Sequence, residues 1–263
     1  MRALRYLRLV RVFAGASISA QLEYRTNFIV NLVGSLLTAG GALFGLFVLY
    51  GDGQPLGGWE YREALVVVGL YTLIQGFIGA FLTPNLNSIG EGVRTGTLDF
   101  TLLKPMDAQF LVSARNVNIF RLTDVAVGLG LITWAVARLP SATVPGTAAG
   151  SLLVLASLVM VYAVWFMLTT TAFWFVKVAN LTDLFSSLFR AGQMPVSAFP
   201  PLVRMIFTFI IPIAFITTVP AEAIVGRATP GSALTALLVA GLLVAVSRWF
   251  WRFALRNYTS ASS

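Results

Sequence analysis

Long apolar runs alternate with short polar segments along the chain, and the length of the runs indicates a membrane protein. A helix needs about 20 predominantly apolar residues to cross the hydrocarbon core of a bilayer. Six segments satisfy this requirement, at residues 28–50, 64–83, 117–137, 150–176, 202–219 and 233–253. We therefore expect an all-α fold, a polytopic membrane protein whose six transmembrane helices form a single domain over residues 1–263. Because the number of spans is even, both termini should lie on the same side of the membrane.

Residues 1–26, before the first span, combine apolar residues and arginines at helical spacing. One face carries Ala3, Tyr6, Leu7, Val10, Phe13 and Ala14. The opposite half carries Arg2, Arg5, Arg8 and Arg11. A basic amphipathic helix of this kind lies in the membrane interface near anionic lipid. We expect an interfacial helix with membrane lipid as a partner. A simpler alternative is that the arginines only mark the cytoplasmic side.

A second one-sided pattern lies between the fourth and fifth predicted spans, in the segment NLTDLFSSLFR. Its apolar face consists of Leu181, Leu184, Phe185, Leu188 and Phe189. This pattern is compatible with another interfacial helix, with an element that docks a partner, and with a continuation of the fourth span. The spacing of the residues does not separate these three interpretations.

The 18 lysines and arginines of the chain are distributed unevenly. Fifteen of them, Arg204 included, fall before the first span, in the connections on the same side, or within the ends of the spans on that side and beyond the last one. Only Arg62, Arg138 and Arg227 fall on the other side. Since cytoplasmic loops carry an excess of Lys and Arg, we expect both termini to be cytoplasmic. The net charge of +8 then reflects membrane topology, and no nucleic-acid partner is expected.

The composition excludes several classes of function. The chain contains no His and no Cys, which removes thiol nucleophiles, imidazole bases and the usual zinc sites. Charged residues make up 11% of the chain, against about 25% in soluble domains. We therefore expect no catalytic residue and no metal site in this chain, which is not an enzyme by itself.

Few ionisable residues fall within the predicted spans. Arg121 and Asp124 lie three positions apart in the third span, and we expect them to pair with each other. No ionisable residue lies clearly at a midplane and no internal repeat is evident, which argues against ion-coupled transport. The motif Gly41-xxx-Gly45 allows helices to approach closely, either within the chain or between two copies.

Two prolines mark the fifth predicted span. Pro212 lies in its middle and should kink the helix, because proline removes a backbone hydrogen bond. Pro220 should end the regular helix. The segment AEAIVGRATPG that follows is apolar enough to re-enter the membrane from the outer side, and an ordinary capped loop is the alternative.

The loop between the second and third spans, residues 84–116, contains the polar stretch GEGVRTGTLDFTLLKPMD at positions 90–107. Its glycines lack the spacing of a phosphate-binding P-loop and of a dinucleotide fingerprint, so nucleotide binding by this chain is not expected. Leu98, Leu102 and Leu103 fall on one side of a short helix and are surrounded by charges. This mixture indicates a surface that offers apolar anchors to a cytoplasmic partner.

Two blocks of the sequence resemble the permease subunits of type II ABC exporters. One is GVRTGTLDFTLLKPMDAQF in the loop, and the other runs from Pro195 to Arg227 as PVSAFPPLVRMIFTFIIPIAFITTVPAEAIVGR. With the six spans and the basic N-terminal helix, the resemblance covers nearly the whole chain. It implies a multi-pass protein of the bacterial inner (plasma) membrane. Such a permease pairs with a second permease, either the same chain or a related paralogue, and with separate cytoplasmic ATPase subunits.

The resemblance also implies roles for particular residues. The N-terminal helix would lie in the interface, and the outer segment with Pro212, Pro220, Glu222 and Gly226 would be re-entrant. ATP and magnesium would bind to the ATPase subunits, and this chain would hold no cofactor. The residues that would couple the loop to the ATPase are Glu91, Arg94, Thr97, Leu98, Asp99, Leu102, Lys104, Pro105 and Asp107.

Members of the family export drugs, antibiotics, lipids and polysaccharides, and we expect a small amphiphilic or lipid-like substrate. The aromatic rings of the fourth span would suit an amphiphilic or aromatic cation, although lipid-facing packing is the favoured explanation. These rings belong to Trp165, Phe166, Phe173, Trp174 and Phe175. The alternatives from other classes are an ion-coupled secondary transporter and a non-transporting scaffold whose loop docks a partner.

Overall fold

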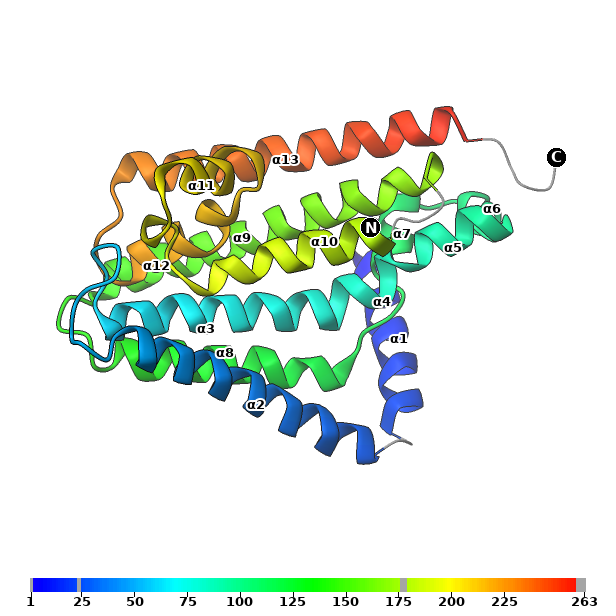
Figure 1. Cartoon of the computed structure of the whole chain (residues 1–263). Coiled ribbons are helices and arrows are strands. Elements are labelled where there is room, and N and C mark those ends of the chain that lie inside the picture. The colour runs from blue at the N-terminus through cyan, green and yellow to red at the C-terminus, as the bar shows by residue number, and fades with distance from the viewer. Residues whose placement is uncertain (1, 23–24, 176–178, 259–263) are drawn as a thin grey trace.

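The computed structural model of the chain describes residues 2–22, 25–175 and 179–258. These residues form helices and loops and contain no β-strand, which confirms the predicted all-α fold. Helices that run along one direction form the bundle, and α1 (Arg2–Leu22) lies across one end of it (Figure 1). The bundle helices are α2 (Arg25–Leu49), α3 (Tyr61–Phe77), α8 (Leu122–Val136), α9 (Val144–Thr170), α10 (Ala179–Phe189) and α13 (Pro230–Arg256).

The two ends of the bundle are built differently (Figure 1). One end, here called the terminal end, holds α1, the end of α13 and four short helices. These short helices are α4 (Thr83–Leu86), α5 (Ser88–Thr95), α6 (Asp99–Leu102) and α7 (Ala108–Ser113). The other end, here called the loop end, consists of the connections at residues 50–60, 137–143 and 225–229. The first and the last described helices therefore meet at one end of the bundle, as an even number of spans requires.

Five helical segments are long and apolar enough to cross a membrane. They are Thr26–Leu49, Tyr61–Thr95, Ile119–Val136, Val144–Phe173 and Pro230–Arg256. Each overlaps one of the predicted spans. The second is extended because α3 continues through the π-helix η1 (Ile78–Leu82) into α4 and α5. A sixth candidate consists of two helical pieces, Pro201–Ile210 and Ala214–Ile224, which meet at a bend of 80°.

The fifth predicted span, at residues 202–219, is broken by this bend at the kink expected from Pro212. The two pieces, here called the re-entrant pair, both connect to the loop end. Before the pair, the Ser197 hydroxyl donates to the Gly57 carbonyl over 2.9 Å. After it, the Arg227 guanidinium donates to the Gly58 carbonyl over 2.7 Å. The pair therefore enters the bundle and returns on the same side.

Pro220 lies within a helix of this segment, and Gly226 lies just after the end of that helix. Pro220 does not end a helix, as was expected, but lies within the second piece, Ala214–Ile224, in the first turn of α12 (Val219–Ile224). The helix ends at Gly226, which has a left-handed φ of 81°. A Cβ atom at this glycine would lie 2.9 Å from the Ser141 carbonyl oxygen, so both the conformation and the space favour glycine.

Helix α10 takes the place of the fifth crossing. It connects the terminal end to the loop end and packs inside the bundle, where Phe185 contacts Trp165 of α9 and Phe189 contacts Tyr71 of α3. It is therefore neither an interfacial helix nor a docking element nor a continuation of α9. The sequence pattern was ambiguous because only one face of α10 is apolar, and the other face is polar.

Arg204 belongs to the loop end, contrary to the sequence-based assignment. Its guanidinium donates to the Ser197 carbonyl over 2.7 Å, next to the first loop. With this correction the loop end holds four of the 18 lysines and arginines, Arg62, Arg138, Arg204 and Arg227. The asymmetry and its predicted orientation are unchanged.

Helix α3 lies at the centre of the bundle, and 72% of its most apolar window is buried. Its closest partner is α8, because glycines let the two backbones touch. A Cβ atom on Gly76 would lie 2.5 Å from the Val125 nitrogen, and one on Gly128 would lie 2.5 Å from the Leu73 nitrogen. Gly41 and Gly45, in contrast, have no atom within 4 Å of an added Cβ. The motif seen in the sequence therefore does not pack within this chain.

We predict that Gly76→Ala and Gly128→Ala each destabilise the protein by about 1–3 kcal/mol, because the added methyl group overpacks a backbone contact. Gly130→Ala is the matched control, since it adds the same methyl group on α8 in open space and improves helix propensity. Thermal unfolding of the purified variants in detergent measures the difference. Equal melting temperatures for Gly128→Ala and Gly130→Ala would contradict the packing described here.

Candidate functional site

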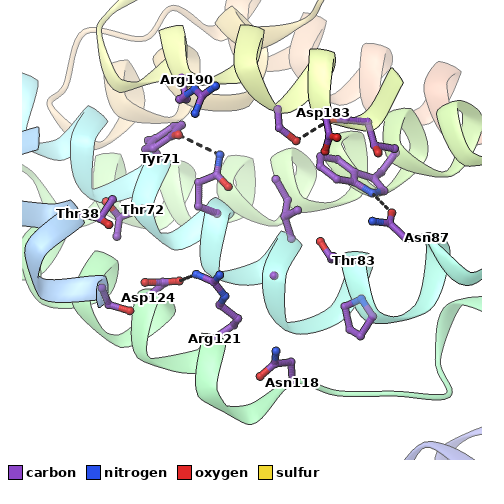
Figure 2. A pocket seen from close by; sticks show the side chains of 18 of the residues that line it. Thr38, Tyr71, Thr72, Thr83, Asn87, Asn118, Arg121, Asp124, Asp183 and Arg190 are labelled. Atoms are coloured by element: carbon purple, nitrogen blue, oxygen red, sulfur yellow. Dashed lines mark hydrogen bonds and ion pairs between the residues drawn. The ribbon is translucent and has the colours of Figure 1, made fainter. Parts of the chain in front are cut away.

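A polar groove of about 600 Å³ opens between α2, α3, α8 and α10. Figure 2 shows side chains from these helices converging on it. Its hydroxyl and amide side chains belong to Ser35, Thr38, Tyr71, Thr72, Gln75, Thr83, Asn87, Asn118, Thr182, Ser186 and Gln193. The volume falls within the range of small-molecule sites, about 300–1,000 Å³, but most such sites have an apolar lining. In the middle of membrane-spanning helices, a polar lining of this density indicates a path or site for a polar group.

Four charged side chains also line the groove. Arg121 and Asp124 form the predicted ion pair, with 3.4 Å between Nη1 and Oδ2. On α10 and the turn after it, the Arg190 guanidinium donates to the Ser187 hydroxyl over 2.8 Å. Among the described residues, neither Asp183 nor Arg190 is part of an ion pair. With two arginines and two aspartates, the groove carries no formal net charge.

The π-helix η1 shapes the floor of the groove. π-Helical turns are rare and occur mainly at functional sites. Here Gly79, within η1, leaves room for Arg121, whose Cγ would lie 2.9 Å from a Cβ at that position. Nearby, the Trp165 indole N–H donates to the Asn87 side-chain oxygen over 3.4 Å, and the Gln75 amide donates to the Tyr71 hydroxyl over 3.0 Å. These bonds orient the polar side chains along one wall.

The groove is closed toward the loop end. The rings of Tyr71 and Phe189 stack there with centroids 5.6 Å apart. Just beyond, Gly192 packs against the re-entrant pair, since a Cβ on it would lie 3.3 Å from methyl carbons of Ile213 and Thr217. The groove thus reaches from the middle of the bundle to the terminal end, where Thr83 and Asn118 line it.

At the loop end, an ion pair joins the re-entrant pair to α3. Arg227 lies 2.7 Å from Glu63, whose side chain is only 6% exposed. The same guanidinium lies over the Trp59 ring, 5.5 Å from its centroid. Glu222, named in the outer segment, accepts a backbone hydrogen bond from Arg227 over 2.7 Å through its own carbonyl. These contacts fix the outer ends of α3 and α12 against each other.

The predicted coupling residues lie in α5, α6 and the turns around them. Glu91 and Arg94 form an exposed ion pair over 2.5 Å. The Thr97 hydroxyl lies 2.9 Å from that of Thr95, and Asp99 begins α6. Lys104 and Pro105 are exposed between α6 and α7.

The exposed apolar side chains of this region differ from those expected. Leu98 is only 4% exposed and holds the turn against the bundle, so it is not an available anchor. Leu102 is half-buried. Leu103 is 81% exposed, and Phe100, which the sequence pattern did not single out, is 70% exposed. Phe100 and Leu103 are three residues apart, so they form one apolar tip on α6.

Asp107 connects this region to the last helix. Its carboxylate caps α7 by accepting from the Phe110 N–H over 3.0 Å, and it forms an ion pair with Arg248 of α13. The Arg248 guanidinium also donates to the Gln109 side-chain oxygen over 3.1 Å. The hydrogen bond from Arg248 lowers the pKa of the Asp107 carboxyl below its usual value, and burial opposes that effect. Arg248 is 141 positions from Asp107, and no local pattern predicts such a pair.

The N-terminal helix packs on the same end of the bundle. The Gln21 side chain donates to the Val117 carbonyl over 2.6 Å and accepts from the Ile119 N–H over 3.0 Å. The ring of Tyr6 contacts that of Phe110 edge to face. Arg8 and Arg11 are exposed, whereas the side chains of Arg2 and Arg5 lie outside the described residues. The interfacial position of α1 stays a prediction.

These features define a polytopic helical membrane protein with a polar groove in its transmembrane helices and a cluster of short helices at one end. Over residues 36–262, the chain matches the family described as ABC-2 family transporter protein. The chain belongs to this family and is a membrane permease component of an ABC transporter, distinct from the ATPase. A comparison with curated proteins finds no match. The family assignment replaces the alternatives of an ion-coupled carrier and a non-transporting scaffold.

We predict that Asp107→Asn destabilises the protein by about 1 kcal/mol at neutral pH, a value reduced for the partial exposure of the ion pair. Because the pKa of Asp107 is lower in the folded state, its contribution is complete above the unfolded value of about 4. It is lost as the pH falls through the folded value. The free energy of unfolding of Asp107→Asn should therefore be lower than that of the wild type at neutral pH, and this difference should disappear at acid pH. Asp52→Asn, at the loop end, is the control and should unfold like the wild type at both.

Proposed function

We propose that the chain is the membrane subunit of an ATP-driven exporter that moves a small amphiphilic or lipid-like molecule out of the cytoplasm. The observation that carries the proposal is a polar groove that runs from the middle of the bundle to the end that holds the α5–α7 cluster, with the Tyr71–Phe189 ring stack at its other limit. A substrate would enter the groove from the cytoplasmic side. The membrane in question is the bacterial inner membrane.

The energy comes from separate ATPase subunits that dock on residues 84–116. The apolar tip of Phe100 and Leu103 supports this docking, because exposed large apolar residues surrounded by charges are typical of protein interfaces. Around the tip lie Lys104 and the Glu91–Arg94 pair. Together with Thr97, Asp99, Leu102 and Pro105, they form the proposed coupling surface. ATP and magnesium bind to the partner, and this chain supplies no cofactor.

Movement of the coupling surface is transmitted to the groove through covalent and ionic connections. Helix α5 follows α3, η1 and α4 without a long loop, so displacement of α5 pulls on the floor of the groove. The Asp107–Arg248 pair connects the other side of the cluster to α13. In this mechanism Asp107 acts as a tie within the permease and does not contact the ATPase.

A second permease, either the same chain or a related paralogue, covers the groove. Polar groups that face hydrocarbon without a partner are costly, so a groove with this lining is closed by protein when the complex is in the membrane. The open space at Gly41 and Gly45 on α2, beside the groove, supports close approach of another helix there. At the terminal end, the arginines of α1 contact anionic lipid.

We predict that the double variant Phe100→Ala, Leu103→Ala loses at least ten-fold in ATPase co-purification and in coupled ATP hydrolysis. The reason is that removal of two exposed anchors takes away the apolar centre of the interface. Val144→Ala is the matched control, because Val144 is 83% exposed and lies at the loop end. Full assembly and ATP turnover in the double variant would refute the docking site, provided that its melting temperature equals that of the wild type.

A further inference from the structure

The lining of the groove indicates the chemistry of the substrate that it accepts. A site for a cationic substrate carries an excess of carboxylates, and a site for an anion carries an excess of arginines. The groove has two of each, so its formal charge is zero. Neither sign of net charge on a ligand would be favoured by the site as a whole.

Hydrogen-bonding groups in the groove are available to a ligand. Among the described residues, the side-chain NH₂ groups of Asn87 and Asn118 donate to no partner, and the Asp183 carboxylate accepts from none. The hydroxyls of Thr72 and Ser186 donate to carbonyls within their own helices, which leaves their lone pairs to accept. The groove therefore presents donors and acceptors side by side, as a polyhydroxylated ligand requires.

The aromatic residues of the fourth predicted span do not form a site for an aromatic cation. Trp165 and Phe166 are buried in the core, and the Trp165 indole N–H donates to Asn87, which lines the groove. Phe173 and Trp174 pack against Trp251 and Phe250 of α13, with centroids 5.5 Å apart in each pair. Recognition of a cation by a ring requires an accessible ring face, and of these four rings only that of Trp165, which is 4% exposed, lines the groove.

Two opposite charges mark the length of the site on its α10 side. Asp183 and Arg190 are seven residues apart, which corresponds to about 10 Å along a helix. Both side chains line the groove and are exposed in it. Since neither forms an ion pair with another described residue, each can contact hydroxyl groups of a ligand that lies between them.

We infer that the groove binds an uncharged, polyhydroxylated head group, of glycoside type, on an amphiphile whose apolar chain stays outside the polar lining. This inference rests on the proposed function and specifies its substrate class. Charge balance between Asp183 and Arg190 determines the selectivity against ionic head groups.

Binding to the purified permease, without the ATPase, tests the inference. The protein in lipid nanodiscs is titrated by equilibrium dialysis with three amphiphiles of equal chain length, each below its micellar concentration, and empty nanodiscs give the background. The probes are octyl glucoside, octyltrimethylammonium and octyl sulfate. We expect saturable binding of octyl glucoside at least ten-fold tighter than that of either ionic probe. Equal binding of all three, or tighter binding of an ionic one, would overturn the inference.

Charge variants provide a second, directional measurement. Asp183→Asn leaves one excess arginine and should improve octyl sulfate binding about ten-fold relative to octyl glucoside. Arg190→Gln should do the same for octyltrimethylammonium, and the double variant should restore the original order. Asp52→Asn is the control and should change nothing. Asp183 on α10 and Arg190 on the turn after it are both exposed, and circular dichroism checks that the variants are folded.

Unchanged selectivity in both single variants would also overturn the inference. That result would not affect the co-purification of the ATPase. Normal co-purification of the ATPase with the Phe100→Ala, Leu103→Ala variant would instead refute the proposed docking surface, whatever the result for octyl glucoside binding. The two proposals therefore fail in different experiments.

Discussion

The close contact between α3 and α8 is the constraint on which the rest of the structure depends. Gly76 and Gly128 let the two backbones touch, and this contact places α3 in the centre of the bundle. The same pairing brings Arg121 and Asp124 of the α8 region to the side of α3 that faces α2 and α10. In a membrane, helices associate through such packing rather than through the hydrophobic effect, so small residues decide which pairs form.

Around this pair, α10 determines the polar groove. Its apolar face, with Phe185 and Phe189, packs on α9 and α3, and its polar face, with Asp183 and Ser186, lines the cavity. One amphipathic helix thus contributes its apolar face to the core and its polar face to the groove. The re-entrant pair then closes the bundle beyond α10, and the Arg227–Glu63 ion pair holds its end against α3.

The two ends of the bundle are connected through the same helices. At the terminal end, α3 continues into the α4–α5 segment, and Arg248 of α13 binds Asp107. At the loop end, α3 carries Glu63, which binds the segment that leads into α13. A change at the α5–α7 cluster therefore acts on two helices that also hold the re-entrant pair. This connectivity links the α5–α7 cluster to both ends of the bundle.

Much of the architecture follows from the sequence alone. Apolar run length predicted the positions of α2, α3, α8, α9 and α13, spacing predicted the Arg121–Asp124 pair, and Pro212 predicted the bend. These are local properties, because hydropathy, helical periodicity and proline chemistry act within a few turns of the chain. The family resemblance, carried by two short blocks, is likewise a property of the sequence and agrees with the family match.

Only the tertiary structure decided which segment crosses as the fifth span, which residues form the apolar tip and how the loop is tied to α13. The fifth crossing was misassigned because a helix that lines a polar groove looks amphipathic, and a re-entrant pair looks apolar. Leu98 and Phe100 exchange roles because burial depends on neighbours from other segments. Asp107 and Arg248 are 141 residues apart, and a contact over that separation exists only once the chain has folded.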